Sequence, residues 1–414
     1  MVFSSINLCY GGRFCNLRVS FSSADGGSEP KHGLGSEDPA WTAVGTARLW
    51  SAGICPTFTR AIMRFTLASS CVIGLLALSP ARGSTATTLD IYFIDVEGGQ
   101  STLLVTPKRQ SFLVDTGWPG SGAPDSRPGD PAQARDAKRI VAAARDAGIK
   151  QIDYLLITHF HTDHDGGVVE LAQLMPIRQF IDHGSLPDEA KRDAATKDAF
   201  EAYLAVRNKA EHIEPKPGDR LPLSGVDATI VSSAASTITR PLAGAGEPNT
   251  VCSRSAPPPG DALENPRSTG VVVTFGKFRF LDVGDLTGQP LFDLACPKNL
   301  IGPVDVYLVA HHGGADASDP ATFAAFKPRV AIMNNGVKKG GAQVTYESLH
   351  HVSGLDDVWQ LHRSEAAGDK NFPAERIANL DESTAHWIKV SASEDGSFRV
   401  LNGRTGEQKT YPTR

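Results

Sequence analysis

From residue 84 onward, short apolar runs and longer stretches with apolar residues at helical spacing follow one another along the chain. The first run, within residues 88–96, alternates as a strand does. The next two runs, 101–107 and 111–117, are separated by a short polar segment and predict a hairpin. The ordered part of the chain is therefore expected to open with a β-meander.

The pattern then changes to alternating strands and helices. A stretch rich in Ala and Arg at 131–147 has helical spacing, and Gly148 stands where helices commonly end. After it we expect a strand, a helix, a second strand and a long helix, over residues 152–158, 168–174, 177–182 and 187–207. This order predicts a series of β–α units.

Residues 233–267, with the run SAPPPGD and several other Gly and Pro, are the least regular interior segment and divide the chain. After them the order repeats, with a strand pair followed by a strand, a short helix and a strand, over 270–275, 278–283, 305–310, 323–326 and 329–334. The last quarter adds apolar runs at 358–362, 386–391 and 398–402. Two such halves predict an α/β architecture of two sheets packed face to face with helices outside.

The beginning of the chain has a different character. Residues 1–62 mix Gly, Ser and scattered charge, so we interpret them as a disordered or untranslated extension. Met63 then opens a segment, 63–83, with one basic residue, an apolar stretch and small residues at its end, which is typical of a secretory signal peptide. A membrane-spanning helix is the alternative, but a bilayer needs roughly 20 apolar residues. Residues 84–414 are then expected to form a single secreted or periplasmic domain with no integral membrane part.

Composition and charge narrow the class of protein. The 414 residues are 41% hydrophobic and 21% charged, as in globular proteins, and 41 Lys+Arg against 46 Asp+Glu give a net charge of −5. Removing residues 1–83, with 7 basic and 4 acidic residues, leaves 34 against 42 and a net charge of −8. This balance excludes a strongly basic nucleic-acid coat. The negative net charge also does not favour nucleic acid as a partner, although a local basic rim could still bind a nucleic-acid strand.

The cysteines bear on the compartment. Six cysteines are too few for a disulfide-built miniprotein, and no CxxC pair occurs to indicate a zinc knuckle. After residue 84 only Cys252 and Cys296 remain. In an oxidising compartment we expect a disulfide between them, with two free buried thiols as the alternative.

Metal-binding residue types concentrate directly after the strand at 152–158, in the run THFHTDHDGG. His159 and His161, two apart in an extended segment, point the same way and can share one ion. Asp163 and His164 can hold a second ion. A solvated surface cluster is the alternative. With 12 His in the chain, however, the chance of this pattern is on the order of one in a thousand, whereas a metal cluster needs such spacing.

Three further strand ends carry similar residues. Asp115 ends one apolar strand, where a carboxylate is costly unless it binds a metal or orients a ligating His. Asp282 and Asp285 follow another strand, and His311 and His312 follow a third. Each motif alone is weak. Together they supply the carboxylate bridge and the remaining imidazole that a two-ion site requires.

These residues resemble the metallo-β-lactamase superfamily, in particular its branch similar to ComEC-type competence proteins and phosphorylcholine esterases. The resemblance covers roughly residues 89–340 and rests on FIDVEGGQSTLLV, FLVDTG, THFHTDHDGG, ENPRSTGVVVTF, FLDVGDL and VYLVAHHGG, in that order. It implies the metallo-β-lactamase fold, a four-layer αβ/βα sandwich. It also implies a dinuclear site, usually two Zn²⁺, with Mn²⁺ or Fe²⁺ as alternatives.

The resemblance further implies a role for each matching residue. His159 and His161 would bind the first ion, Asp285 would bridge, and the second ion would be bound by Asp163, His164 and either His311 or His312. We favour His311, because it follows its strand directly. Asp163 and Asp285 would also be catalytic, and Asp115 and Asp282 would lie behind the ligands.

The chain departs from the pattern in places. No residue clearly matches the third-motif histidine of the superfamily, and His183 is an alternative metal ligand, a substrate contact or a structural residue. The early glycine-glutamine-glycine-aspartate run is replaced by the segment 97–101, and Lys338 and Lys339 replace a histidine-proline pair. Asn335, Lys338 and His362 are candidates for the rim that meets the substrate, although a loop lysine is more often simply solvated.

The predicted function is a dinuclear metal-dependent hydrolase in which two ions activate a bridging water to hydroxide. Phosphoester bonds, as in phosphodiesters, fit the resemblance best. The alternatives are a lactone, thioester or β-lactam substrate on the same site, and a non-catalytic metal-binding scaffold. The expected partner is a small-molecule or phosphoester substrate.

Overall fold

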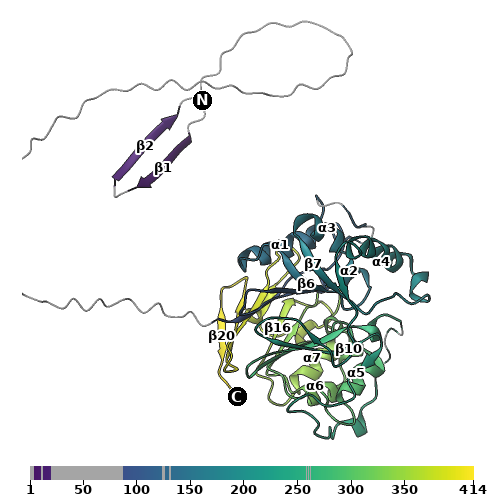
Figure 1. Cartoon of the computed structure of the whole chain (residues 1–414). Coiled ribbons are helices and arrows are strands. Elements are labelled where there is room, and N and C mark those ends of the chain that lie inside the picture. The colour runs from purple at the N-terminus through teal and green to yellow at the C-terminus, as the bar shows by residue number, and fades with distance from the viewer. Residues whose placement is uncertain are drawn as a thin grey trace, which may run out of the picture. The chain divides into compact units, whose positions relative to one another are not determined.

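The computed structural model describes residues 87–414 except 124–125, 130–131, 258, 260 and 262, together with the backbone of two N-terminal strands. The chain divides into two units, Met1–Leu78 and Ser79–Arg414. In the first unit, β1 (Ser4–Tyr10) pairs antiparallel with β2 (Arg13–Val19) (Figure 1). The interpretation of residues 1–62 as a disordered or untranslated extension stays a prediction. The predicted signal segment 63–83 lies outside the described residues.

The first sheet of the second unit has the strand order β20-β19-β18-β3-β4-β5-β6-β7-β8 within the described residues. Strands β5, β6, β7 and β8 run parallel, and the others pair antiparallel. The strands are β3 (Leu89–Phe93), β4 (Thr102–Val105), β5 (Ser111–Val114), β6 (Ile152–Leu156), β7 (Ile177–Ile181), β8 (Glu211–Ile213), β18 (Ile388–Ala392), β19 (Phe398–Asn402) and β20 (Gln408–Tyr411).

The second sheet has the order β11-β10-β12-β13-β14-β15-β16-β17 in the part of the chain that the structure describes, and β9 pairs with β10. From β13 to β17 the strands are parallel. The strands are β9 (Arg220–Leu221), β10 (Asp227–Ser233), β11 (Ser236–Thr237), β12 (Gly270–Phe275), β13 (Phe278–Asp282), β14 (Val306–Leu308), β15 (Val330–Met333), β16 (Asp357–His362) and β17 (Ile377–Asn379).

Helices cover the outer face of each sheet (Figure 1). The first sheet carries α1 (Arg135–Asp146), α2 (Thr162–Asp165), α3 (Val168–Leu174) and α4 (Ala194–Arg207), and the second carries α5 (Gly288–Ala295), α6 (Pro320–Phe326) and α7 (Gln343–His350). Short 3₁₀ turns are η1 (Ala190–Arg192), η2 (Cys252–Arg254), η3 (Asn265–Arg267), η4 (His311–Gly313), η5 (Ala315–Ala317), η6 (Gly368–Lys370) and η7 (Ala374–Arg376). The predicted four-layer αβ/βα sandwich is therefore confirmed.

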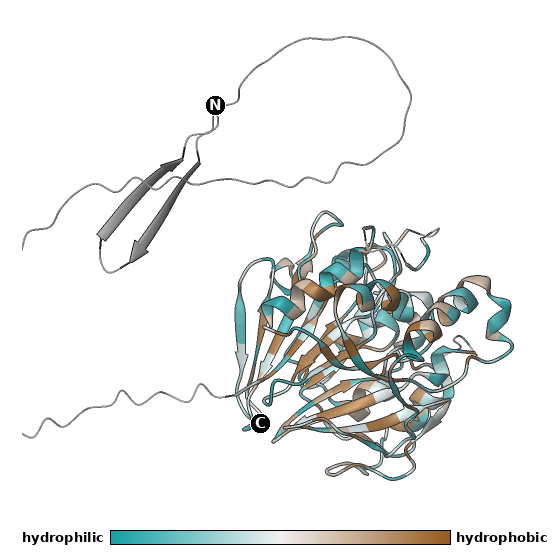
Figure 2. Cartoon of the chain, turned by 45° about the horizontal axis from the view of Figure 1, so that its top comes forward, coloured by the Kyte–Doolittle hydropathy of each residue, from teal (hydrophilic) through white to brown (hydrophobic). Residues whose placement is uncertain are grey.

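Three apolar layers hold the sandwich together. Along β3, Ile91 and Phe93 belong to the layer between the two sheets, whereas Tyr92 belongs to the layer under the helices of the first sheet. A third layer lies between the second sheet and its helices and includes Tyr307 and Phe323. Because most strands are buried on both faces, they are continuously apolar rather than alternating. Figure 2 shows this as hydrophobic strands inside more hydrophilic helices and loops.

Most predicted elements are present, with some differences. The long helix predicted at 187–207 is split, because Asp193 accepts a hydrogen bond from the Thr196 amide at 2.8 Å and begins α4 anew. The apolar runs at 386–391 and 398–402 become β18 and β19, and they return to the first sheet beside β3. The sequence does not predict β10, α5 or α7.

The strand topology places the predicted site residues at one edge of the sandwich. The parallel strands β5 and β6, and the parallel strands β13 and β14, end in the loops that hold the four predicted motifs. Cys252, in the segment between the two halves, and Cys296, directly after α5, form a disulfide with a Cα–Cα distance of 5.7 Å. No helix within the described residues combines the length and hydropathy needed to cross a bilayer.

Candidate metal centre

Four side chains converge where the two sheets meet: Asp163, His164, Asp285 and His312. The His164 Nε2 atom lies 3.2 Å from Asp163 Oδ2, 3.1 Å from Asp285 Oδ2 and 3.3 Å from His312 Nε2. His312 Nε2 in turn lies 3.2 Å from each of the two carboxylate oxygens. A tetrahedral ion with ligands about 2.0–2.1 Å away needs ligand atoms roughly 3.3–3.4 Å apart. The four atoms therefore have the spacing of a tetrahedral metal site.

The burial of these groups supports the same interpretation. All four residues are buried, and His164 is fully so. Asp285 Oδ1 and His312 Nδ1 are buried without a hydrogen-bond partner among the described residues. Buried carboxylates without compensation are costly, so a cation that accepts their lone pairs satisfies this cluster. The donor set of two carboxylates and two imidazoles suits a borderline divalent ion such as zinc.

Asp115 contacts one of these four side chains, His164. Its Oδ2 accepts a hydrogen bond from His164 Nδ1 at 2.7 Å, and the Thr158 hydroxyl and amide donate to its two oxygens, also at 2.7 Å. Because Asp115 holds the Nδ1 proton, Nε2 is the atom that faces the centre, and its lone pair would be available to a metal ion that displaces the second proton. Asp115 adopts a left-handed backbone with φ 59°, an uncommon conformation that concentrates at functional sites.

His159 and His161 lie beside this group. His159 Nε2 lies 3.0 Å from His161 Nδ1 and 3.8 Å from Asp285 Oδ2. Burial, together with the neighbouring His164 and His161, lowers the pKa of His159 well below its usual range, so its ring is neutral and keeps a lone pair. His159 and His161 are thus placed to share an ion next to Asp285. Their nitrogen atoms are grouped less closely around one point than the atoms of the four converging residues.

The histidine doublet differs from our expectation. His312, not the favoured His311, points into the group with Asp163 and Asp285. Both residues have left-handed backbones, φ 50° and 53°, so the side chain nearest the strand turns aside and the next one turns in. His311 Nε2 lies 3.7 Å from Asp285 Oδ2, and its Nδ1 is paired with Asp316 at 2.7 Å. His311 therefore stands at the edge of the centre.

The carboxylates of the centre are held ionised. Burial alone would raise the pKa of Asp285, but His164, His312 and His311 outweigh it and hold that pKa well below its usual range. In the same way, Lys339 and His164 outweigh burial and lower the pKa of Asp163. Ionised oxygens are the form that binds a metal.

The chain segment that carries the ligands is fixed by close packing. His161 is extended, and α2 begins at Thr162, so Asp163 and His164 project from one helical turn. A Cβ atom on Gly166 would lie 2.2 Å from the Thr162 carbonyl oxygen, and one on Gly167 would lie 2.3 Å from that of Thr116. Both positions therefore require glycine because the backbones approach so closely.

His183 is close to this segment but is not among the grouped ligands. Its Nε2 is 3.1 Å from Glu264 Oε2, and the same oxygen accepts a hydrogen bond from the Phe160 amide at 3.0 Å. His183 and Glu264 thus hold the backbone between His159 and His161. This position favours a structural role over that of a metal ligand.

Asp282 lies behind the centre without touching the four grouped ligands. Gln100 Nε2 donates to Asp282 Oδ1 at 3.1 Å, and Asn334 Nδ2 donates to Gln100 Oε1 at 3.2 Å. Burial raises the pKa of Asp282 to about 7. The Gln100 side chain therefore connects the segment 97–100 to the loop that holds Asp285.

The predicted substrate rim is largely wrong. Asn335 is fully buried and donates to backbone carbonyls, because the following loop folds over it. His362 is also fully buried and has no position at the opening. Lys338 is exposed, but it is the neighbouring Lys339 whose ammonium pairs with Asp163 Oδ2. The sequence contains no signal that distinguishes the two lysines.

His362 belongs to a second cluster, here called the Arg139 cluster, which consists of Asp95, Glu97, Arg139 and His362. His362 Nε2 lies 2.7 Å from Asp95 Oδ1 and 3.3 Å from Glu97 Oε2. Arg139 donates to Asp95 Oδ2 at 3.1 Å and to Glu97 Oε1 at 3.0 Å. The three acidic and imidazole groups are spaced as metal ligands are, but the guanidinium already neutralises part of their charge.

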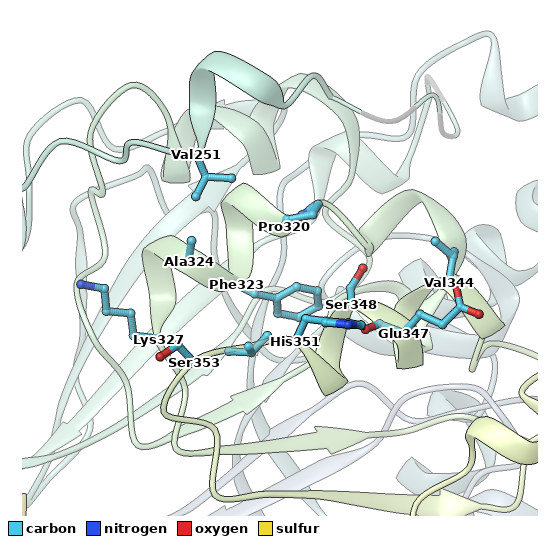
Figure 3. A pocket seen from close by; sticks show the side chains of 11 residues that line it. Val251, Pro320, Phe323, Ala324, Lys327, Val344, Glu347, Ser348, His351 and Ser353 are labelled. Atoms are coloured by element: carbon cyan, nitrogen blue, oxygen red, sulfur yellow. The ribbon is translucent and has the colours of Figure 1, made fainter.

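Several hollows lie on the surface of this unit. A cleft of about 670 Å³ opens beside the centre and is lined by Trp118, His161 and Asp163, with Glu189, Arg192, Asp193 and Asp261 farther along. Another, of about 700 Å³, lies between α6 and α7 and includes Phe323 and His351 (Figure 3). None of the predicted site residues lines the second hollow. The first cleft is therefore the one that gives a substrate access.

Sequence comparison points the same way as this geometry. A sequence profile described as the metallo-beta-lactamase superfamily matches residues 95–241, which include Asp115 and the run from His159 to His164. The chain contains a metallo-β-lactamase superfamily domain. The match ends before Asp285 and His312, so the structure alone places those two residues with the others.

Within the superfamily, two curated relatives are similar to parts of the chain. ComE operon protein 3 of Bacillus subtilis is 23% identical over 271 residues, 64% of this chain and 30% of that protein. This similarity supports a ComEC-like branch. The lactamase-like protein aptB of Emericella nidulans is 32% identical over 102 residues, 25% of this chain and 28% of its own. The chain thus spans less than a third of either relative.

Solved structures of the superfamily include the metallo-beta-lactamase fold protein YhfI from Bacillus subtilis. The superposition of YhfI on this chain has a TM-score of 0.39 at 10% sequence identity, and it covers 66% of this chain and 96% of YhfI.

Proposed function

We propose that this chain is a zinc-dependent hydrolase that cleaves phosphoester bonds, with two ions held side by side at the edge of the sandwich. The observation that carries the proposal is the tetrahedral spacing of Asp163, His164, Asp285 and His312 around one point. His159 and His161 are the proposed ligands of the other ion, and Asp285 is the proposed shared ligand. The fully buried His164 and the partly open cleft next to His161 suit a site that is rigid at its base and accessible above.

When bound, divalent ions lower the pKa of water and stabilise negative charge that develops on the substrate. The residues of the chain hold and orient the reacting groups. Asp115 keeps the proton of His164 on Nδ1, and Asp316 does the same for His311. The His311 side chain is 27% exposed and its Nε2 faces the centre. Burial lowers the pKa of His311, but Asp285 and Asp316 outweigh burial and raise it, so we propose that the ring, protonated on both nitrogens, donates its Nε2 proton to the leaving group and is left neutral with its proton on Nδ1.

The choice of a phosphoester rests on the similarity to the ComEC-like branch. A lactam is the second candidate, and the similarity to the lactamase-like protein of Emericella nidulans favours it. A lactone or a thioester would use the same ions. A non-catalytic scaffold is disfavoured, because a chain that had lost activity would have little reason to keep six ligands. Export through the segment 63–83 remains a further proposal.

The test is metal analysis of the purified full-length chain, followed by assays on a phosphodiester, a phosphomonoester, a β-lactam and a lactone. We expect two equivalents of zinc and hydrolysis of a phosphoester. Asp163→Asn should remove metal and activity together, whereas Asp227→Asn, an exposed control on β10, should change neither. Less than one equivalent of metal, or unchanged activity in Asp163→Asn, would refute the proposal. Hydrolysis of the lactam alone would replace the substrate class.

A further inference from the structure

One cation of the chain itself stands at the candidate centre. Lys339, in the loop between β15 and α7, pairs its ammonium with Asp163 Oδ2 and donates a hydrogen bond to the Gly98 carbonyl at 3.0 Å. The same ammonium lies 5.4 Å from the centre of the Trp118 ring, within the range of a cation–π contact. Its side chain is 38% exposed, so it is reachable from solvent.

The position of Lys339 is set by two interlocked loops. The Gly336 amide donates to the Lys339 carbonyl at 2.9 Å, which closes the loop into a tight turn. A Cβ atom on Gly98 would lie 2.8 Å from the Gly336 nitrogen and 2.9 Å from Lys339 Cβ, and Gly98 has φ +83°. Only glycine fits there, so the two loops touch directly. Lys339 is therefore placed by the backbone and does not reach the site as a loose surface lysine.

Lys339 and a metal ion would use the same oxygen. Asp163 Oδ2, which accepts the ammonium, is also the oxygen that lies 3.2 Å from His164 Nε2 and from His312 Nε2. An ion at that point places two like charges on one carboxylate oxygen, and they repel one another. The ammonium must then turn away from Asp163, and its tether to the Gly98 carbonyl keeps it beside the centre.

The cleft next to the centre needs a cation if its substrate is an anion. Glu189, Asp193 and Asp261 all line it, with Arg192 as a basic residue on its far part. These carboxylates repel a phosphate group. A positive group at the metal end, next to Trp118 and Asp163, offsets that repulsion at the point where the reacting phosphorus would lie.

We propose that Lys339 is the anion-binding residue of this site, and that it leaves Asp163 when metal binds and then holds a non-bridging oxygen of a phosphoester. The inference rests on the proposed function and deepens it, since it assigns a negatively charged substrate class. No bond is made or broken by Lys339. It binds the substrate and determines specificity.

The test uses Lys339→Met, which keeps the length of the side chain and removes its charge, with the exposed neighbour Lys338→Met as the matched control. Zinc affinity of the full chain is measured by competition with a chelator. We expect Lys339→Met to bind zinc several-fold more tightly, because the competing ammonium is gone, and Lys338→Met to bind it as the wild type does.

Binding of inorganic phosphate to the zinc-loaded protein is measured next, by calorimetry. We expect phosphate affinity to fall by about tenfold or more in Lys339→Met, because a hydrogen bond to a charged group is lost. Lys338→Met should keep the phosphate affinity of the wild type. Lys339→Arg keeps the charge and should retain most of the phosphate affinity, which separates charge from packing. The rate on a phosphodiester should fall in Lys339→Met, while the rate on a neutral ester should not.

Several outcomes would overturn the inference. Unchanged zinc and phosphate affinities in Lys339→Met show that the ammonium does not compete and does not bind the anion. Equal loss of zinc and phosphate binding shows a structural role. If the wild type hydrolyses only a lactam but Lys339→Met still loses phosphate affinity, the proposed phosphoester function fails and the anion-binding role stands.

Discussion

Two clusters of carboxylate and imidazole groups lie in the same unit of this chain, and they neutralise their charge differently. In the Arg139 cluster a guanidinium contacts both carboxylates, and His362 completes the set. In the candidate metal centre three carboxylates, Asp115, Asp163 and Asp285, meet mainly imidazoles whose lone pairs face inward. A buried carboxylate needs a cation. The first cluster has a guanidinium between its two carboxylates, whereas in the second the ammonium of Lys339 pairs with Asp163 alone.

The comparison also explains a strained residue. Glu97 has φ 56°, a conformation that costs a non-glycine residue on the order of 1 kcal/mol. Its carboxylate is bonded to Arg139 at 3.0 Å, so the network holds the residue in that conformation. His311 and His312, which also have left-handed backbones, contact carboxylates instead, His311 at Asp316 and His312 at Asp163 and Asp285. This difference predicts that metal stabilises one cluster and leaves the other unchanged.

The largest effect is expected from Asp285→Asn, because this carboxylate faces both proposed ions. Loss of a residue that only orients a metal ligand lowers metal affinity or activity by about 10–100-fold. Removal of a shared ligand should therefore lower metal affinity and activity by on the order of 10³-fold or more. The measurement is zinc content and kcat/KM, with Asp227→Asn as the control. Full zinc content in the variant would contradict the shared role of Asp285.

Arg139→Met should cost about 3 kcal/mol in the free energy of unfolding, because it leaves two mostly buried carboxylates with His362 as their remaining partner in the cluster. Urea unfolding of the metal-free chain measures this loss. Lys389→Met, which removes the more exposed pair with Asp90, is the control and should cost at most about 1 kcal/mol. A similar cost in both variants would mean that the Arg139 cluster is not specially dependent on its cation.

The histidine doublet gives a smaller, differential effect. His312→Ala should lower zinc affinity by about 10–100-fold or more, since His312 is one of the four converging ligands. His311→Ala should leave the first zinc equivalent in place and chiefly lower kcat. Chelator competition and steady-state kinetics separate the two. The reverse result would restore His311 as the ligand that its position after the strand suggests.

The smallest effect concerns pH. Burial would lower the pKa of His362, but its hydrogen bond to Asp95 and the charges of Asp95 and Glu97 outweigh burial and raise it. A raised imidazole pKa stabilises the fold fully below about pH 6.5, the unfolded value, and the contribution is lost as pH rises through the folded pKa.

The stability advantage of the wild type over His362→Gln should therefore be largest in mildly acidic buffer and shrink towards alkaline pH. Thermal unfolding of both proteins across this range measures it, with Arg139 and Glu97 intact. An advantage that grows with pH would show that His362 is neutral in the fold.

The local part of the site could be predicted from the sequence, and the long-range part could not. His159, His161, Asp163 and His164 lie within one strand end and one helical turn, so their spacing alone places them together. The doublet could not be resolved, because left-handed φ values at both residues reverse which ring points inward. The rim at Asn335 failed for a related reason, since strand ends are open only where no loop covers them.

The fold likewise has a part that local sequence patterns predict and a part that depends on contacts between distant residues. Strong apolar runs predicted most strands and the two-sheet sandwich, whereas α7 (QVTYESLH) is short and its apolar face is weak. The placement of β18 beside β3 depends on contacts between residues far apart in the sequence, and no local pattern encodes it.

That pairing has a consequence for how the chain folds. Lys389 pairs with Tyr92, so β3 stays an open sheet edge until residues 388–392 have been synthesised and can reach it. Contacts of such sequence separation form slowly, because a long loop must close before they contribute. The half of the sandwich that carries the HxHxDH ligands is thus expected to be completed late. A chain truncated before residue 388 should aggregate rather than form a smaller active domain.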